Sequence, residues 1–216
     1  MIEIEIFSDV VCPWCFIGKV RLDAVLRSPV GEGVQLRWRP YQLQPQIPAE
    51  GLDRDLYLAR RYGEQTDSAK VPQRIVQEAA TEGLTLRYDL IKRMPNTQLA
   101  HQLLAFAYPY GVQHRLAQIL FEAYFCRGID VGDMHELMAA AQQAALPLDK
   151  LQAYINRNEG LEEIEQQRLR AADLGLSGVP GYYLADRFLL PGVQDRDTME
   201  QIIQRVKNKL ASTAAD

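Results

Sequence analysis

The chain opens with a short segment in which apolar and acidic residues alternate. Residues 2–7 have the sequence IEIEIF, with the two-residue period of a half-buried β-strand. Residues 19–26 place their apolar side chains near helical spacing, and residues 34–41 return to an alternating pattern. Because a helical crossover joins parallel neighbours in a sheet, this opening predicts a β-α-β unit.

A long stretch without alternation follows. From about residue 52 to residue 156 the apolar positions recur with helical periodicity, and no strand pattern is present. Glycines separate the periodic segments, which predict helices over 52–61, 71–82, 97–108, 113–125, 134–144 and 148–156. We therefore expect the middle of the chain to be an all-helical insertion.

The last quarter of the chain has a mixed pattern again. It predicts a helix over 159–174, a hairpin over 178–185 and 188–190, a final helix over 198–210, and a frayed tail over 212–216. The element order is β-α-β, the helical insertion, and then α-β-β-α. We interpret the chain as an α/β protein whose sheet-containing domain, 1–45 and 157–216, is interrupted by a helical insertion domain, 46–156.

Charged residues on the first two strands follow the same alternation as the apolar ones. Glu3 and Glu5 share one face of the first strand, and Arg37 and Arg39 share one face of the second. Opposite charges on neighbouring strands attract by about 0.2–1 kcal/mol per pair. We expect these four residues to form cross-strand ion pairs.

Composition narrows the classes of partner and location. The net charge of −4 and the pI near 5.5 argue against a nucleic-acid partner. No apolar run approaches the ~20 residues that span a membrane. Three cysteines in 216 residues are too few for a disulfide scaffold. Because the first predicted strand begins at residue 2, we expect no signal peptide. We expect a cytoplasmic protein with reducible thiols.

The strongest chemical signal is a Cys-x-x-Cys pair between the first strand and the first helix. Cys12 and Cys15 are separated by Pro13 and Trp14. Unpaired N–H groups and the helix dipole favour a thiolate at a helix N-terminus, and proline fits the first helical turn. Two sulfurs three residues apart can close a disulfide. We expect Cys12 to be the nucleophile and Cys15, further inside the helix, to be the resolving thiol.

Two other interpretations of the Cys12–Cys15 pair are half of a zinc site and two unreactive core cysteines, and the position of the pair at a strand–helix junction favours a redox role over both. A structural zinc site needs two more ligands, and the remaining candidates, Cys126, His101, His114 and His135, include no second closely spaced pair. We therefore expect no metal. Cys126 follows a predicted helix, and it is either an idle thiol or a second redox partner for Cys12.

Several motifs together resemble one known family. They are SDVVCPWCFIG at 8–18, NT at 96–97 with AH at 100–101, AYF at 123–125 with GIDV at 128–131, GVP at 178–180 and GVQ at 192–194. From residue 2 to about residue 205 the chain resembles the DsbA-like thioredoxin superfamily, and its FrnE-like branch in particular. The resemblance implies a thioredoxin fold interrupted by a helical insertion.

The resemblance also implies a place for the substrate. In such folds the Val–Pro bond before the third strand is cis and faces the dithiol, and Val179-Pro180 matches it. An extended substrate would then pair with the backbone at Val179 and bring its cysteine beside Cys12. Pro13 and Trp14 are expected to contact that substrate, with Trp14 exposed or half-exposed.

Related kappa-class glutathione transferases and hydroxychromene carboxylate isomerases suggest a second function. In them the inserted helices wall a glutathione groove, for which Asn96, His101 and Gln194 are the candidates here. The favoured hypothesis is a thiol–disulfide oxidoreductase acting on a protein thiol or disulfide, or on glutathione as co-substrate, with no resident cofactor. The alternative is a glutathione-dependent isomerase or transferase acting on a small aromatic substrate, and a third is a chaperone-like binding module. The sequence leaves open the direction of electron flow, the identity of the substrate, and whether the chain forms a homodimer.

Overall fold

The centre of the protein is a four-stranded mixed sheet. The computed structural model describes residues 1–63 and 71–213. The strand order is β2-β1-β5-β6, with bounds β1 Ile2–Ser8, β2 Val34–Pro40, β5 Gly181–Leu184 and β6 Phe188–Pro191. Strand β1 pairs in parallel with β2, while β5 is antiparallel to both β1 and β6. The predicted β-α-β unit and the closing hairpin are confirmed.

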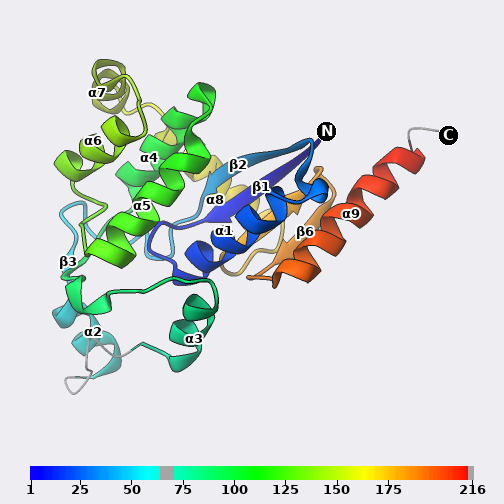
Figure 1. Cartoon of the computed structure of the whole chain (residues 1–216). Coiled ribbons are helices and arrows are strands. Elements are labelled where there is room, and N and C mark those ends of the chain that lie inside the picture. Colours follow the sequence, from blue (N-terminus) through cyan, green and yellow to red (C-terminus); the bar gives the residue numbers. More distant parts are fainter. Residues whose placement is uncertain (64–70, 214–216) are drawn as a thin grey trace.

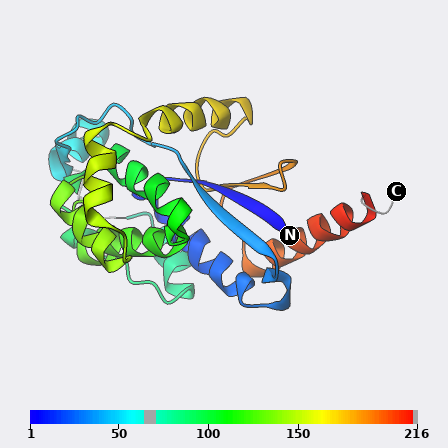
Figure 2. The same cartoon turned by 90° about the horizontal axis from the view of Figure 1, so that it is seen from above.

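Helices cover both faces of this sheet. Helices α1 (Pro13–Leu26) and α9 (Arg196–Thr213) pack against each other on one face, and α8 (Leu161–Asp173) lies on the other (Figures 1 and 2). The α/β fold with an inserted set of helices is therefore as expected. Helix α9 runs further than predicted, because Ser212, expected in a frayed tail, is still helical. The rest of that tail, 214–216, lies outside the described residues.

The inserted segment lies beyond the carboxyl ends of β1 and β2 (Figure 1). Its helices are α2 (Arg54–Tyr62), α3 (Gln73–Thr81), α4 (Gln98–Ala107), α5 (Gln113–Arg127), α6 (Met134–Gln143) and α7 (Leu148–Asn156), with 3-10 turns η2 (Tyr88–Leu90) and η3 (Tyr108–Tyr110); a further turn, η1 (Pro29–Gly31), precedes β2. The insertion is not entirely helical, because β3 (Leu52–Asp53) and β4 (Arg93–Met94) pair antiparallel. Strands of two residues are too short to produce a periodic signal, so the sequence did not reveal them.

An aromatic cluster ties the insertion to the first helix of the sheet domain. The ring of Phe16 stacks on Phe121 and Phe125 of α5, with centroid separations of 5.3 and 6.0 Å. All three side chains are fully buried in the main hydrophobic core. Stacked aromatic pairs add about 0.5–1.5 kcal/mol beyond their burial. Because Phe16 follows Cys15 directly, the cluster fixes the turn that carries both cysteines.

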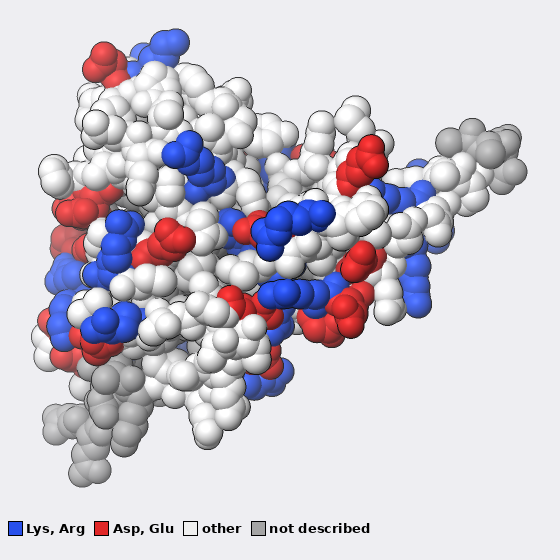
Figure 3. All heavy atoms as spheres, in the orientation of Figure 1, with Lys and Arg blue, Asp and Glu red and all other residues white. Residues whose placement is uncertain are grey.

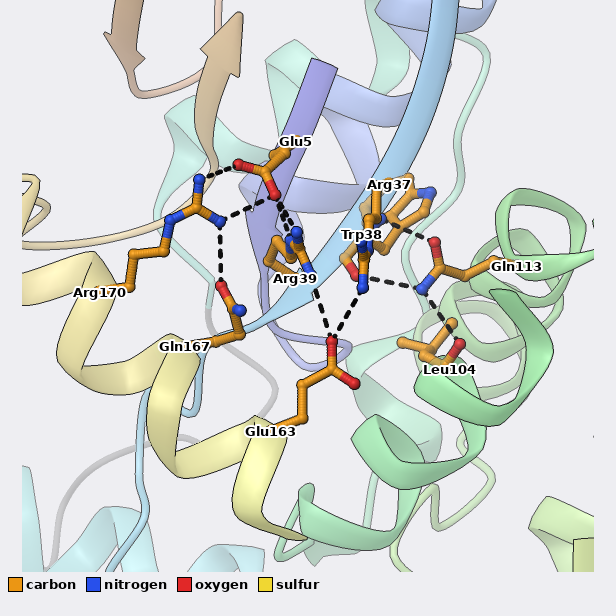
Figure 4. A network of polar contacts seen from close by, with 9 residues as sticks. All are labelled: Glu5, Arg37, Trp38, Arg39, Leu104, Gln113, Glu163, Gln167 and Arg170. Atoms are coloured by element: carbon orange, nitrogen blue, oxygen red, sulfur yellow. Dashed lines mark hydrogen bonds and ion pairs between the residues drawn. The ribbon is translucent and has the colours of Figure 1, made fainter. Parts of the chain in front are cut away.

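The expected cross-strand ion pair exists for one glutamate only. The buried carboxylate of Glu5 pairs with Arg39 of β2 and with Arg170 of α8 (Figure 4). Burial by itself would raise the pKa of Glu5, but the two guanidinium groups outweigh it and hold that pKa below its usual value. Glu3 is exposed and makes no ion pair in the described chain, since its partner in the strand register is Gln35. Arg37 pairs instead with Glu163 of α8.

The surface carries both signs of charge. Figure 3 shows lysine and arginine interspersed with aspartate and glutamate over the face that it presents. Across residues 1–63 and 71–213, no helix combines the length and the apolar character needed to cross a membrane.

Candidate active site

Cys12 lies at the start of α1, where the strand turns into the helix. It is the residue before the first helical position, Pro13, and its backbone is extended. Its carbonyl accepts the N–H groups of Cys15 and Phe16, and its own N–H donates to the Asp9 carbonyl at 3.0 Å. The thiol is therefore held at the positive end of the helix dipole.

The chain segment before β5 comes directly against this thiol. Cys12 Sγ lies 3.6 Å from the carbonyl oxygen of Val179, and the Val179–Pro180 peptide is cis. Strand β5 reaches this place because it pairs with β1, with Gly181 opposite Phe7. Cys12 is only 3% exposed, so the surrounding segments cover most of the thiol.

Cys15 lies one helical turn deeper and is 1% exposed. Burial raises the pKa of its thiol well above the usual range, and the neighbouring Cys12 raises it further. The Ser8 hydroxyl and the Asp9 backbone act in the opposite direction but are weaker. Both cysteines are free thiols in this structure, and Cys15 is the one that the fold keeps protonated.

Trp14 is half-buried between the core and the insertion. The guanidinium carbon of Arg74, on α3, lies 5.5 Å from the centroid of its ring. Such cation–π contacts contribute about 0.5–1 kcal/mol at accessible positions. Helix α3 is therefore in contact with the residue between the two cysteines.

A polar and aromatic pocket opens beside the Cys-x-x-Cys turn. Its volume is about 210 Å³. Its lining is Val11, Pro13, Gln44, Arg54, Tyr57, Leu58, Arg61, Tyr62, Tyr88, Met94, Tyr124 and Phe125. Burial raises the pKa of the Tyr88 phenol, and Tyr88 lines the same pocket as Pro13, the residue that follows Cys12. The guanidinium of Arg54 lies 5.6 Å from the Tyr88 ring.

Sequence reasoning did not select the arginines of this pocket. Arg54, Tyr57 and Arg61 are spaced i, i+3 and i+7 along α2, which places them on one helical face. That spacing was visible in the sequence, but nothing local indicates that the face is turned toward Cys12.

The three residues expected to wall a glutathione groove each make local contacts, and two of them, Asn96 and His101, lie at the start of α4. The Asn96 amide donates to the Ile47 carbonyl at 2.6 Å and supports a loop. His101 is 2% exposed and faces Asp9 inside the core. The Gln194 amide donates to the Pro191 and Gly192 carbonyls after β6. None of the three lines the pocket beside Pro13.

Cys126 lies at the end of α5 in a different hollow. That hollow, of about 540 Å³, is lined by residues that include Phe16, Arg87 and Glu122 but neither Cys12 nor Cys15. Burial, with the charge of Glu122, raises the pKa of the Cys126 thiol. A thiol with a raised pKa is a weak nucleophile at neutral pH.

Potential metal ligands come together at one place in the described part of the chain. Asp133, His135 and Glu136 form this group, at the start of α6, and two of them are exposed. The group contains neither cysteine of the Cys-x-x-Cys pair.

Comparison with known proteins gives a consistent result over nearly the whole chain. The family model described as DSBA-like thioredoxin domain matches residues 3–204. The chain is 24% identical over 210 residues to uncharacterized protein YwbO of Bacillus subtilis, covering 96% of this chain and 98% of that protein. It is similar to a probable DsbA oxidoreductase of Streptomyces coelicolor, with a TM-score of 0.82, 25% identity and 96% and 91% of the chains covered. It also has the fold of a Pseudomonas aeruginosa protein described as cytosolic disulfide reductase DsbM with GSH. The TM-score is 0.69 at 15% identity, and the match covers 95% of this chain and 99% of that one.

Proposed function

We propose a redox function for this chain, which belongs to the DSBA-like thioredoxin domain family: it is a thiol–disulfide oxidoreductase that uses Cys12 and Cys15. One observation carries the proposal. Cys12 sits at the N-terminus of α1 against the Val179 carbonyl, and Cys15 lies one turn deeper as a protonated thiol. This arrangement supports different roles for the two cysteines, with Cys12 as the nucleophile and Cys15 as the resolving thiol.

The reaction follows from these roles. The Cys12 thiolate attacks one sulfur of a substrate disulfide, and the other substrate sulfur leaves as a thiolate. Cys15 then loses its proton and attacks Cys12, which forms the Cys12–Cys15 disulfide and releases the second substrate thiol. The substrate gains two electrons and the dithiol loses two. A substrate dithiol reverses the same steps.

The pocket beside Pro13 suggests what kind of substrate approaches. Arg54 and Arg61 offer guanidinium groups to a carboxylate, and four tyrosines offer phenol groups and ring faces. Oxidised glutathione, or a protein cysteine joined to glutathione, has carboxylates within reach of its disulfide. The Pseudomonas protein with the same fold is described with GSH. Glutathione is therefore the first co-substrate to test. Because that Pseudomonas protein is described as cytosolic, we also infer a cytoplasmic location for this chain.

The test has two parts. First, the protein is equilibrated with glutathione mixtures and its thiols are trapped, with Cys126→Ala as the background so that one pair titrates. A two-electron transition belonging to Cys12 and Cys15 supports the proposal; about 30 mV corresponds to a tenfold change in the equilibrium constant. Absence of any Cys12–Cys15 disulfide at every ratio contradicts it.

The second part separates the redox reaction from the alternatives. Cys15→Ala should accumulate a mixed disulfide on Cys12, and Cys12→Ala should accumulate none. A glutathione-dependent isomerase would keep its turnover in Cys15→Ala, because that chemistry does not need the resolving thiol. A binding module would retain its client in both variants.

A further inference from the structure

His114 joins the helical insertion to two elements of the sheet domain. It lies in the first turn of α5, and its side chain is half-buried. The indole N–H of Trp38, on β2, donates to His114 Nδ1 at 3.1 Å. On the other side of the ring, His114 Nε2 lies 2.6 Å from Asp23 Oδ1 of α1. One side chain of the insertion therefore contacts both β2 and α1.

These contacts decide where the imidazole carries its proton. An indole N–H can only donate, so His114 Nδ1 is the unprotonated acceptor of the Trp38 hydrogen bond. The one proton of a neutral imidazole is then on Nε2, which donates it to the Asp23 carboxylate. The bridge between β2 and α1 therefore requires a neutral His114, and both of its nitrogens are engaged in it.

The neighbouring residue, Gln113, makes a contact of the same kind that does not titrate. Its amide oxygen accepts the backbone N–H of Trp38 at 2.8 Å, and its amide nitrogen donates to the Trp38 carbonyl at 3.1 Å (Figure 4). An amide does not change its charge, so these two hydrogen bonds do not depend on the protonation of a side chain. The indole of Trp38, in contrast, is held only while His114 Nδ1 can accept.

We propose that His114 is a pH-sensitive switch at the joint between the insertion and the sheet domain. When the imidazole takes a proton from solvent at Nδ1, that nitrogen becomes a donor and no longer accepts the Trp38 indole N–H. The hydrogen bond to β2 breaks, while the contact with Asp23 becomes an ion pair. Protonation thus exchanges a bridge between two elements for a contact with α1 alone. The inference does not depend on the proposed redox function.

The charges next to His114 act on its proton in opposite directions. Asp23 favours the imidazolium: burial by itself would raise the pKa of this carboxyl group, but hydrogen bonds from His114 and Lys19 outweigh it and keep that pKa below its usual value. Lys19 lies 2.7 Å from the same carboxylate and is 3% exposed, so it opposes a second positive charge there. Lys19 is influenced in turn by Glu122 of α5 and by Arg27 at the end of α1, with opposite signs.

The other charged residues of β2 and α5 have partners of their own. Arg37 and Arg39, on either side of Trp38, pair with Glu163, and Arg39 also pairs with Glu5; on α5, Arg115 donates to the Gln143 carbonyl and Glu122 accepts from Gln118. A proton that arrives at His114 therefore acts first on the Trp38 hydrogen bond.

Release of the indole reaches the neighbourhood of the dithiol. Trp38 is 4% exposed, so its N–H has little access to water as a substitute for His114. The Trp38 ring packs edge-on against Phe121, with 5.9 Å between the centroids. Phe121 stacks on Phe16, which follows Cys15 directly. The switch is therefore two ring contacts away from the Cys-x-x-Cys turn.

The indole N–H signal of Trp38 reports the switch directly. Trp14 and Trp38 are the only tryptophans of the chain, so the ¹H–¹⁵N spectrum of the reduced protein has two indole signals, and Trp14→Phe assigns them. From about pH 8 to about pH 5, where histidine changes its charge, the Trp38 signal should move. Its exchange with water should quicken roughly tenfold relative to the Trp14 signal, as expected for the loss of one buried hydrogen bond. The Trp38 backbone amide, held by Gln113, should stay protected.

Three histidine variants assign the transition. His114→Gln should abolish it, because an amide does not titrate. His135→Gln is the matched control, since this exposed histidine lies at the start of α6 beside Glu136, and it should titrate like the parent protein. His101→Gln is the second control, because His101 and Trp38 line one small cavity, and it should also keep the transition.

The parent protein tests the same assignment without a substitution. At about pH 8 the imidazole nitrogen signals of His114 should show the neutral ring with its proton on Nε2. A proton on Nδ1 at that pH, or a Trp38 indole signal that does not respond to acid, overturns the proposal. A transition that persists in His114→Gln, or that is lost in His101→Gln, overturns it as well.

Discussion

Cys12 Sγ lies 3.6 Å from the carbonyl oxygen of Val179, although 167 positions separate the two residues in the chain. The pairing of β5 with β1 produces this contact, because Gly181 lies opposite Phe7, and Cys12 and Val179 follow and precede those strands. The nucleophile and the backbone expected to hold its substrate are thus placed by the same pair of strands. The predictions below test the chemistry and the framework of that site.

The three thiols of the reduced protein should differ in their reactivity toward an alkylating reagent. Because burial raises the pKa of Cys15, we expect iodoacetamide to leave Cys15 unmodified at neutral pH in the folded protein and to modify it after denaturation. Peptide mapping by mass spectrometry measures this. In the oxidised protein the same mapping should find Cys12 linked to Cys15 and Cys126 free. A Cys126 disulfide would show instead that the third thiol takes part in the redox reaction.

Arg61→Ala should weaken the binding of substrates that carry carboxylates. Arg61 lines the pocket beside Pro13, and its planar guanidinium can donate two parallel hydrogen bonds to one carboxylate. We expect KM for oxidised glutathione to rise by roughly tenfold, with a smaller effect on an uncharged disulfide. Arg60→Ala is the matched control, since Arg60 is on the same helix, is exposed and does not line the pocket. Equal effects of the two variants would argue against recognition by Arg61.

Glu5→Gln should destabilise the fold by about 3 kcal/mol, the lower end of the cost of breaking a buried ion pair, because Arg39 and Arg170 lose their shared carboxylate. Urea denaturation at neutral pH measures the free energy of unfolding. Glu3→Gln is the control, because Glu3 is exposed, and we expect a change within about 0.5 kcal/mol.

The same carboxylate predicts a pH dependence. The folded pKa of Glu5 is lowered, so its contribution to stability is present above the unfolded pKa near 4.5 and is lost as the pH falls through the folded value. The parent protein should therefore lose stability below about pH 4.5, and Glu5→Gln should lose less over the same interval. Parallel acid unfolding curves for the two proteins would contradict this assignment.

Gly18→Ala should disturb the core packing between α1, which carries the dithiol, and Tyr182 of β5. A Cβ atom on Gly18 would overlap the hydroxyl of Tyr182, whose side chain is fully buried. Overpacking of a core typically costs about 1–3 kcal/mol, and we expect a loss of stability in that range. Gly178→Ala is the control, because a Cβ atom there has no neighbour within 4 Å and should be neutral or slightly stabilising. Thermal unfolding of the two variants measures the difference.

Local patterns of the sequence were sufficient for the element order and for the dithiol. The alternating residue types of β1 and β2 were enough to identify both segments as strands, and the two cysteines share one helical turn, so neither conclusion needs a distant residue. The structure shows that β1 is buried on both faces from Ile4 to Ser8, where Glu5 is paired with Arg39 and Arg170. The approach of Val179 was expected from the resemblance of the GVP motif to a known family and not from local periodicity. The short strands β3 and β4, which pair with each other, were not predicted because a two-residue strand is too short to show an alternating pattern.

The sequence by itself determined which residues could do the chemistry: a thiol at a helix N-terminus, a second thiol one turn later, and a helical insertion between two halves of a sheet. Only the tertiary structure decided what surrounds them. It placed the Arg54–Arg61 face of α2 in the pocket beside the dithiol, engaged the amides of Asn96 and Gln194 in local loop hydrogen bonds, and buried His101 against Asp9. The physical reason is that periodicity gives the apolar face of each helix but not its neighbour, and the neighbour depends on how all the side chains pack into one core.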